Sequence, residues 1–227
     1  MDFTAVAHDL RSPLHVMLGH MQLLAAEQLT DTGRQRLEIL EAQVQRMMRL
    51  LERWDGRQAD VTASRTVDIG VLIRNLVGEL APLFGVHGIE VTANIEGTLS
   101  QVAGDADSLY RALLNIAVNA AEAIAGGGKI TIAARMARPP LSNRPPMVDV
   151  EVADTGSGIA ADVLPHVFTR GFTTKPPGES HGLGLDICRE IVEMHGGQIH
   201  LASAPGAGTT VHLFLPPVIP TAPRDRA

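Results

Sequence analysis

The sequence predicts an α+β protein, in which an antiparallel helical hairpin is followed by a two-layer α/β sandwich. Three observations predict this fold class. Through residues 6–54, apolar residues recur every three or four positions, as on helices that each bury one stripe. Between residues 89 and 215, short segments alternate apolar and polar residues as strands do, and longer apolar segments with helical spacing separate them. Alternating strands indicate a sheet with helices on one face and solvent on the other, rather than a doubly wound sheet.

Composition sets limits on class and location. The chain has 227 residues, of which 45% are apolar, which is enough for one or two domains with a real core. Its single cysteine excludes an intramolecular disulfide and fits a reducing cytoplasm. A net charge of −6 without a Lys/Arg cluster argues against nucleic acid or an anionic membrane as partner. No signal peptide or run of about eighteen uncharged apolar residues is visible, so we expect a cytoplasmic chain without membrane contact of its own, which can be one part of a longer, membrane-tethered protein.

The first domain is predicted at residues 1–57. One apolar stripe runs from Val6 to about Leu29, and a turn at residues 30–33 separates it from a second stripe at residues 37–54 with heptad spacing. Two such narrow stripes cannot cover each other well enough for a stable lone hairpin. A partner hairpin would complete a four-helix bundle, so we predict a homodimer through residues 1–57.

Pro13 leaves two possible starts for the first helix. Ser12 could be the N-cap with Pro13 at the first helical position, which leaves His8 on a preceding arm. Alternatively, the helix begins near residue 2, and Pro13 bends it one turn past His8. The stripe through Val6 and Leu10 favours the second arrangement.

The second domain is predicted at residues 67–217, after a linker at 58–66 and before a tail at 218–227. Each of its expected elements has the apolar period of a helix or of a strand. Helices are expected at 69–84, 107–125 and 182–195, and strands at 89–95, 129–135, 147–153, 198–203 and 209–215.

Two glycine pairs bracket a predicted nucleotide pocket. An apolar strand ends in Asp154-Thr155-Gly156-Ser157-Gly158, so a carboxylate lies beside two residues that have no Cβ to keep a ligand off the backbone. Gly182-Leu183-Gly184 opens an apolar helix, whose first N–H groups and positive dipole end suit phosphates. The intervening loop is rich in Gly, Thr, Pro and Ser and has few apolar residues, so we predict that it is a mobile cover over the pocket. Either pair alone is also an ordinary turn.

Two amides lie on the apolar helix at 107–125. Asn115 and Asn119 are one turn apart, so their side chains point the same way, and buried amides need partners. Hydrogen bonds to each other or to the backbone would satisfy them, and so would a ligand.

Together, these glycine pairs and their spacing resemble the glycine boxes of the Bergerat-fold ATPases, with residues 206–209 compatible with the last box. The run His8-Asp9-Leu10-Arg11-Ser12-Pro13 is similar to the phosphoacceptor box of sensor histidine kinases, which belong to that superfamily. The resemblance covers nearly the whole chain, and the segment Phe172-Thr173-Thr174-Lys175 is closest to nitrogen-regulation-type kinases.

For the second domain, the resemblance implies a site for ATP and Mg²⁺. Asn119 matches the asparagine that holds Mg²⁺ against the phosphates, and Asn115 matches the position where gyrase-like relatives have a glutamate base. An amide cannot take up a proton, so direct hydrolysis should be weak. Asp154 matches the residue that reads adenine, Gly156 and Gly158 let the base approach, and Lys175 could reach the phosphates. The second glycine box corresponds to Gly182, Leu183 and Gly184.

For the first domain, the resemblance implies a phosphotransfer site. His8 would be the nucleophile, because a neutral imidazole can take a phosphoryl group in line from ATP. Asp9 would orient the proton on the other ring nitrogen, and Ser12, at i+4 from His8, stands at the position tied to dephosphorylation of the partner. The partner would be the receiver domain of a response regulator, whose aspartate takes the phosphoryl group.

Two other functions remain compatible with parts of the sequence. One is an ATP-driven clamp of the gyrase or chaperone type, which Asn115 and the His8 box disfavour. The other is a degenerate kinase that acts as an ATP-binding interaction module, because Ser180 and His181 replace the Gly-Thr that usually precedes the second glycine box.

Overall fold

The computed structural model describes residues 66–140, 144–169, 172 and 184–218, with single helical residues before them: Leu14, Met17, Met21, Gly33, Leu40, Val44 and Met47. Some predicted site residues lie outside the described residues, namely His8, Asp9, Ser12, Lys175, Gly182 and Leu183. Of the described N-terminal residues, Leu14 and Val44 are buried in one cluster, with Met21 packed against it. The cluster joins residues of the two predicted stripes.

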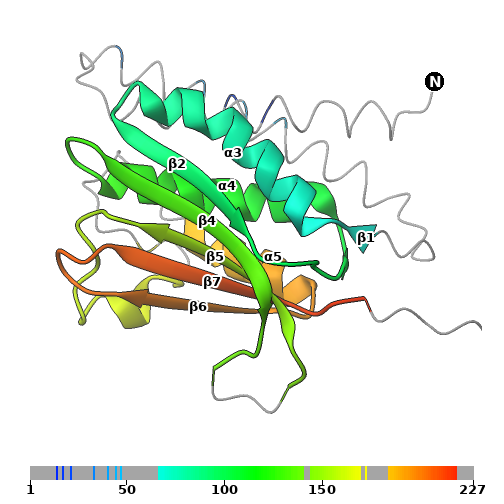
Figure 1. The fold of residues 1–227 in the computed structure, drawn as a ribbon. Coiled ribbons are helices and arrows are strands. Elements are labelled where there is room, and N and C mark those ends of the chain that lie inside the picture. Colours follow the sequence, from blue (N-terminus) through cyan, green and yellow to red (C-terminus); the bar gives the residue numbers. More distant parts are fainter. Residues whose placement is uncertain are drawn as a thin grey trace, which may run out of the picture.

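A five-stranded sheet forms the centre of the second domain (Figure 1). Its strands lie in the order β2-β4-β5-β7-β6. The β2–β4 pair is parallel, and the other neighbouring pairs are antiparallel. The strands are β2 (Ile89–Ile95), β4 (Gly128–Ala137), β5 (Met147–Asp154), β6 (Gln198–Ser203) and β7 (Thr209–Leu215).

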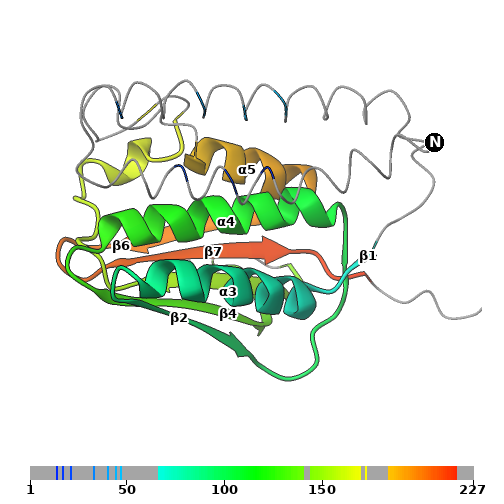
Figure 2. The same ribbon diagram turned by 90° about the horizontal axis from the view of Figure 1, so that it is seen from above.

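Three helices cover one face of this sheet: α3 (Ile69–Gly85), α4 (Ala106–Ala123) and α5 (Gly184–Met194) (Figure 2). Capping fixes where the first two begin, because the Asp68 and Asp105 carboxylates accept from backbone N–H groups in the first turn, each at 2.9 Å. Alternate residues of the strands, such as Ile132, Val150 and Leu213, join these helices in one core. Among the described residues, no helix is long and apolar enough to cross a membrane.

The predicted fold class is confirmed, and the five main strands lie within two residues of their predicted ends. The sequence missed two strands of two residues each, β1 (Thr66–Val67) and β3 (Val102–Ala103), which pair antiparallel outside the main sheet. Pro217 bridges to Val102 on β3, and the Val218 N–H donates to the Gln101 carbonyl at 2.7 Å. A strand of two residues is too short for alternation to reveal it.

The sheet face opposite the helices, which we call the open face, is partly exposed to solvent along most of its strands, as predicted, but three of its residues are buried. Asp149, Met147 and Phe214 lie on it and are buried, and neither apolar residue belongs to the main core. The side chains on this face cover one another. The His212 and Phe214 rings are stacked with their centroids 5.9 Å apart, and the His200 ring meets the Phe214 ring edge-on with the centroids 5.6 Å apart. Alternation in the sequence identified the two faces but could not show how much of the second is covered.

Candidate nucleotide-binding site

The candidate site is built around the carboxylate of Asp154, the last residue of β5. Its Oδ1 atom accepts hydrogen bonds from the N–H groups of Gly156, at 2.7 Å, and Thr209, at 3.2 Å. Within the described residues, no group donates to Oδ2. Burial raises the pKa of Asp154, and these two backbone hydrogen bonds partly offset that effect. Asp154 therefore presents a fixed, half-buried carboxylate with one acceptor oxygen to spare.

The turn after Asp154 is attached to β4 and to the end of α4. The Thr155 N–H donates to the Lys129 carbonyl at 3.1 Å, and the Thr155 hydroxyl accepts from the Lys129 N–H at 2.9 Å. The Ser157 N–H donates to the Ala123 carbonyl at 2.9 Å, which satisfies one of the unpaired carbonyls at the end of the helix. The turn is thus positioned by two separate elements.

The glycines of this turn allow close packing of backbone against backbone. A Cβ on buried Gly156 would lie 2.7 Å from the Ala123 carbonyl oxygen. Gly158 and Gly208 both have positive φ, +69° and +77°, and a Cβ on either would overlap a backbone carbonyl oxygen, that of Ala204 or of Asp154. The sequence interpretation assigned Gly156 and Gly158 to the approach of a base; the structure gives them a packing requirement as well.

Ser203 is a positioning residue that the sequence interpretation missed. Its hydroxyl accepts from the Ile159 N–H and donates to the Gly208 carbonyl, both at 2.8 Å. It therefore joins the turn after β5 to the glycine loop before β7. The only sequence signal for this role was its position three residues before Gly206. That signal is weak, because serine is common at strand ends.

The two predicted amides of α4 lie in different environments. Asn115 is partly buried, and its side chain hydrogen-bonds the fully buried Cys188 thiol, which itself donates to the Ala112 carbonyl at 3.4 Å. Burial raises the pKa of Cys188 to about 12, so this thiol is an inert core group. Asn119 is exposed, one turn before the end of α4 that holds the Asp154 turn. Asn115 thus ties α4 to α5, and Asn119 is the amide that a ligand can reach.

Of the predicted phosphate end, Gly182-Leu183-Gly184, the structure describes Gly184, which is the first residue of α5. The aromatic residues on the near side of the predicted cover make ring contacts. The Arg189 guanidinium lies 6.0 Å from the centre of the Phe168 ring, and the His166 and Phe172 rings lie 5.8 Å apart. Phe168 therefore contacts α5 through Arg189.

The described residues fit a nucleotide. A half-buried carboxylate oxygen without a donor suits the exocyclic amine of a base. The exposed Asn119 amide offers an oxygen that suits a hard cation, and the start of α5 offers N–H groups that suit phosphates. The structure brings Asp154, Gly156, Gly158 and Thr209 together. It does not describe the segment expected to complete the phosphate side.

Two protein families match the chain. Residues 104–219 match the family described as histidine kinase-, DNA gyrase B-, and HSP90-like ATPase, and residues 3–55 match the His Kinase A (phospho-acceptor) domain. The first match covers about half of the chain and contains Asn115, Asn119 and Asp154.

Similar proteins include sensor histidine kinase ZraS of Escherichia coli, which is 33% identical over 219 residues, covering 93% of this chain and 44% of the relative. Sporulation kinase D of Bacillus subtilis is 29% identical over 219 residues, covering 93% of this chain and 40% of the relative. The chain thus spans less than half the length of these two relatives.

Two solved structures are also similar. The mycobacterial sensor histidine kinase MprB has a TM-score of 0.57 at 28% identity, covering 69% of this chain and 100% of that one. Full-length ShkA in complex with AMPPNP has a TM-score of 0.61 at 25% identity, covering 97% of this chain and 46% of that one.

Proposed function

The chain belongs to the family of histidine kinase-, DNA gyrase B- and HSP90-like ATPases, and we propose that it is the catalytic core of a sensor histidine kinase. It would transfer the γ-phosphoryl group of ATP to its own His8 and then to an aspartate of a response-regulator receiver domain. The observation that carries this proposal is the order of the two matched families on one chain: a phospho-acceptor domain that includes His8 precedes an ATPase domain that includes Asp154.

Asp154 provides the selection of base. Its Oδ2 atom would accept from the exocyclic amine of adenine, while Oδ1 stays bonded to the backbone of Gly156 and Thr209. Guanine has a carbonyl at the corresponding position, from which a carboxylate cannot accept, so ATP is favoured over GTP. The similar ShkA structure in complex with AMPPNP, an ATP analogue, supports this assignment.

The phosphate side would be formed by α4 and the start of α5. We assign Asn119 as the residue that holds Mg²⁺, because its amide is exposed on the same side of α4 as the partly buried Asn115. Bound Mg²⁺ would offset the negative charge of the phosphates. The backbone N–H groups of Gly182, Leu183 and Gly184 would bind phosphate oxygens, with Lys175 as a further cation.

The residues assigned to the chemistry favour transfer to His8 over transfer to water. At Asn115, an amide that cannot take up a proton stands where a base would activate water. An imidazole nitrogen of His8 would attack the γ-phosphorus, forming the N–P bond as the bond to the β–γ bridging oxygen breaks and ADP leaves. Asp9 would accept the hydrogen bond of the other ring nitrogen, and Ser12 would lie beside the phosphorylated ring.

A homodimer through residues 1–57 is part of the proposal, followed by a linker at 58–66, an ATP-binding domain at 67–217 and a tail at 218–227. The exposure of the described residues in the two apolar stripes of residues 1–57 supports this homodimer. Leu14 and Val44 are buried, whereas Met17, Leu40 and Met47 are 53%, 55% and 44% exposed. Three large apolar side chains left open on a helical pair are typical of a surface that a second copy covers.

The test is incubation of the chain with Mg²⁺ and γ-labelled ATP, followed by acid and alkali challenge. We expect acid-labile, alkali-stable label, as phosphohistidine gives. His8→Gln should abolish the label without changing ATP affinity, and the matched control His20→Gln, on the same predicted helix outside the box, should retain it. Undiminished label in His8→Gln would overturn the assignment of the phosphoacceptor.

A further inference from the structure

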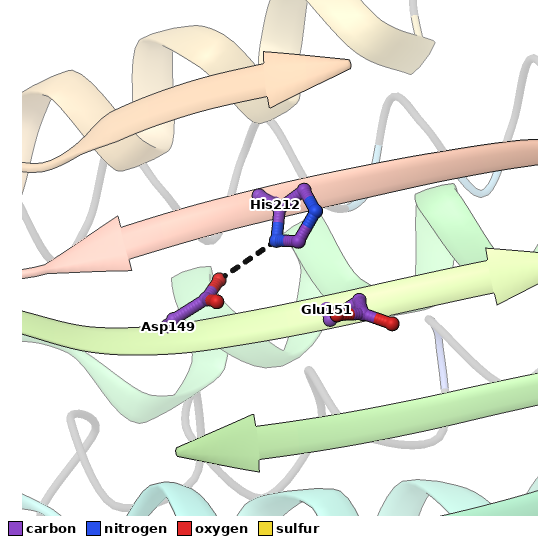
Figure 3. Close-up of side chains that lie close together, drawn as sticks. All are labelled: Asp149, Glu151 and His212. Atoms are coloured by element: carbon purple, nitrogen blue, oxygen red, sulfur yellow. Dashed lines mark hydrogen bonds and ion pairs between the residues drawn. The ribbon is translucent and has the colours of Figure 1, made fainter. Parts of the chain in front are cut away.

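A cluster of three potential metal ligands lies on the open face (Figure 3). Asp149 and Glu151 are two residues apart on β5, so strand geometry places both side chains on the same face. His212 is directly opposite Glu151 on the neighbouring strand β7. One ligand atom from each residue lies within 4.8 Å of the other two.

The cluster contains a deeply buried carboxylate. Asp149 is 1% exposed and is the buried charged residue of the described part of the chain. A buried charge needs compensation, and two groups provide it: the His212 Nδ1 atom lies 3.0 Å from Oδ1, and the Arg135 Nη2 atom lies 3.2 Å from Oδ2. The site is therefore already organised to hold positive charge.

Arg135 is a replaceable counter-ion. The same Nη2 atom lies 3.3 Å from Glu151 Oε2, so one guanidinium bridges both carboxylates. The Arg135 side chain is 40% exposed, and its long stem can carry the guanidinium into solvent. The two carboxylates and His212 would remain, held on adjacent central strands of the sheet.

We propose that Asp149, Glu151 and His212 form a binding site for a divalent transition-metal ion such as Zn²⁺, which takes the place of the Arg135 guanidinium. One imidazole nitrogen and two carboxylate oxygens are ligands that Zn²⁺ accepts, whereas Mg²⁺ and Ca²⁺ prefer oxygen alone. His212 binds through Nδ1, and the ring then carries its proton on Nε2.

The distances suit such an ion. Zinc–ligand bonds of about 2.0–2.2 Å place neighbouring ligand atoms about 3–4 Å apart. The His212 Nδ1 to Asp149 Oδ1 distance of 3.0 Å is already in that range. Glu151, whose side chain is 24% exposed, is the ligand that adjusts, and its exposure gives solvent and the ion a route to the site. Water fills the remaining coordination position.

A second imidazole lies beside the cluster. His200 on β6 is directly opposite His212 on β7, and so shares the open face. Its Nε2 atom is buried and has no hydrogen-bond partner among the described residues. A buried ring nitrogen without a hydrogen-bond partner is unusual, but His200 does not belong to the cluster of mutually close ligand atoms, so we do not assign it as a ligand.

The proposed site would also stiffen the nucleotide site. A metal ion bound by β5 and β7 joins two strands that each supply an end to that site, Asp154 at the end of β5 and Thr209 at the start of β7. Binding of Zn²⁺ should therefore raise the melting temperature of the protein without ATP.

The test is equilibrium dialysis and calorimetric titration of the whole chain with Zn²⁺ alone, without nucleotide. We expect one tight site per chain. Loss of outer-shell partners already weakens metal sites by about 10–100-fold, so His212→Gln and Glu151→Gln should each weaken binding by at least about tenfold. The control His87→Gln, which removes an exposed imidazole elsewhere, should change nothing.

Arg135→Gln gives the decisive comparison, because it removes the competing cation and should tighten Zn²⁺ binding. Circular dichroism of each variant distinguishes a folding defect from the loss of a metal ligand. Glu151→Gln is the variant that should disturb folding least, because Glu151 is partly exposed. The proposal is overturned by the absence of tight Zn²⁺ binding, by binding that survives both His212→Gln and Glu151→Gln, or by weaker binding in Arg135→Gln.

Discussion

The two oxygens of Asp154 have different roles, and this division explains why the residue is an acid. Oδ1 accepts two backbone N–H groups and shapes the turn, a role that an asparagine oxygen could also fill. A second oxygen that can only accept is required at the Oδ2 position only if a ligand donates a hydrogen bond to it.

The same carboxylate makes stability depend on pH. Because burial raises the pKa of Asp154, its charge opposes folding. The free energy of unfolding therefore falls as the pH rises through the interval above the ordinary pKa of 3.8, and it recovers on acidification.

Asp154→Asn should therefore separate binding from stability. The variant keeps an oxygen for the backbone and loses the buried charge, so at neutral pH it should be at least as stable as the parent. Its amide would place an N–H against the amine of adenine, which should cost about 1–3 kcal/mol, or roughly 5- to 150-fold in ATP affinity. Thermal unfolding and calorimetric titration measure the two effects.

Asp162→Asn, at an exposed loop carboxylate, is the control and should change neither quantity. Unaltered ATP affinity in Asp154→Asn would remove Asp154 from the base site, and a large loss of stability would show that its charge is structural.

The sequence identified those site residues that lie close together along the chain. Asp154, Gly156 and Gly158 were predictable because their signal is local spacing. Ser203 and Thr209 were not, because their contacts with the Asp154 turn join residues 44 and 55 positions apart, and pairing across a sheet fixes them.

At the scale of elements, one junction fastens the end of α5 to the start of α4. The His195 Nδ1–H donates to the Ile191 carbonyl at 2.7 Å, and Nε2 accepts from the Asp105 N–H at 3.0 Å, so the ring is neutral with its proton on Nδ1. Asp105 is the N-cap of α4. The imidazole lies so close to Gly104, whose φ is +152°, that a Cβ there would overlap the ring.

Gly104→Ala should destabilise the domain, because it must push His195 out of both hydrogen bonds and also adopt an unfavourable φ. We expect a loss of about 1–3 kcal/mol, the usual size for overpacking. Urea unfolding would measure it.

Gly78→Ala is the matched control for that substitution. Gly78 lies within α3 with nothing within 4 Å of its would-be Cβ, so alanine there should stabilise by up to about 1 kcal/mol. Equal stability of the two variants would show that His195 can move away from a Cβ at position 104 with little loss of folding free energy.

Elements with several periods of apolar residues were predicted well, and those without were missed. The spacing along α4 and the alternation along β5 each repeat several times, whereas β1 and β3 have two residues each. The end of α4 also differed: it was expected at Ala125, but Ile124 is already extended, because the Ala123 carbonyl accepts from the turn at Ser157.

At the scale of the whole molecule, the matches at residues 3–55 and 104–219 confirm the resemblance drawn from the His8 box and the glycine pairs. Neither the nitrogen-regulation subtype nor the domain boundaries are tested by these matches, and they stay predictions. The order of a phospho-acceptor domain and an ATPase domain could be read from the sequence because each carries its own local motif. The arrangement of the two domains relative to each other depends on contacts between distant segments, which no local motif encodes.

Deleting residues 1–57 should give a monomeric domain that still binds ATP, because the predicted dimer surface lies in the deleted part. Light scattering and nucleotide titration would measure both properties. A dimer from the shortened chain would contradict the predicted interface.

In the full chain, Leu40→Lys should weaken the dimer, since it places a charge on the exposed apolar stripe. The matched control Met194→Lys, at a still more exposed apolar position on α5, should leave the dimer intact. If both variants dimerise like the parent, Leu40 lies outside the interface.

The small pairing around β3 has a consequence for how the ATPase-type domain joins other domains. Val102 is paired with Val67, near the first described residue of the domain, and with Pro217, near its last. The chain therefore enters and leaves the domain at one corner, roughly two strand spacings apart, or about 10 Å. Because both ends lie at this corner, we expect the domain to keep its sheet when it is fused to different neighbours at either end, or when it is circularly permuted with a short linker.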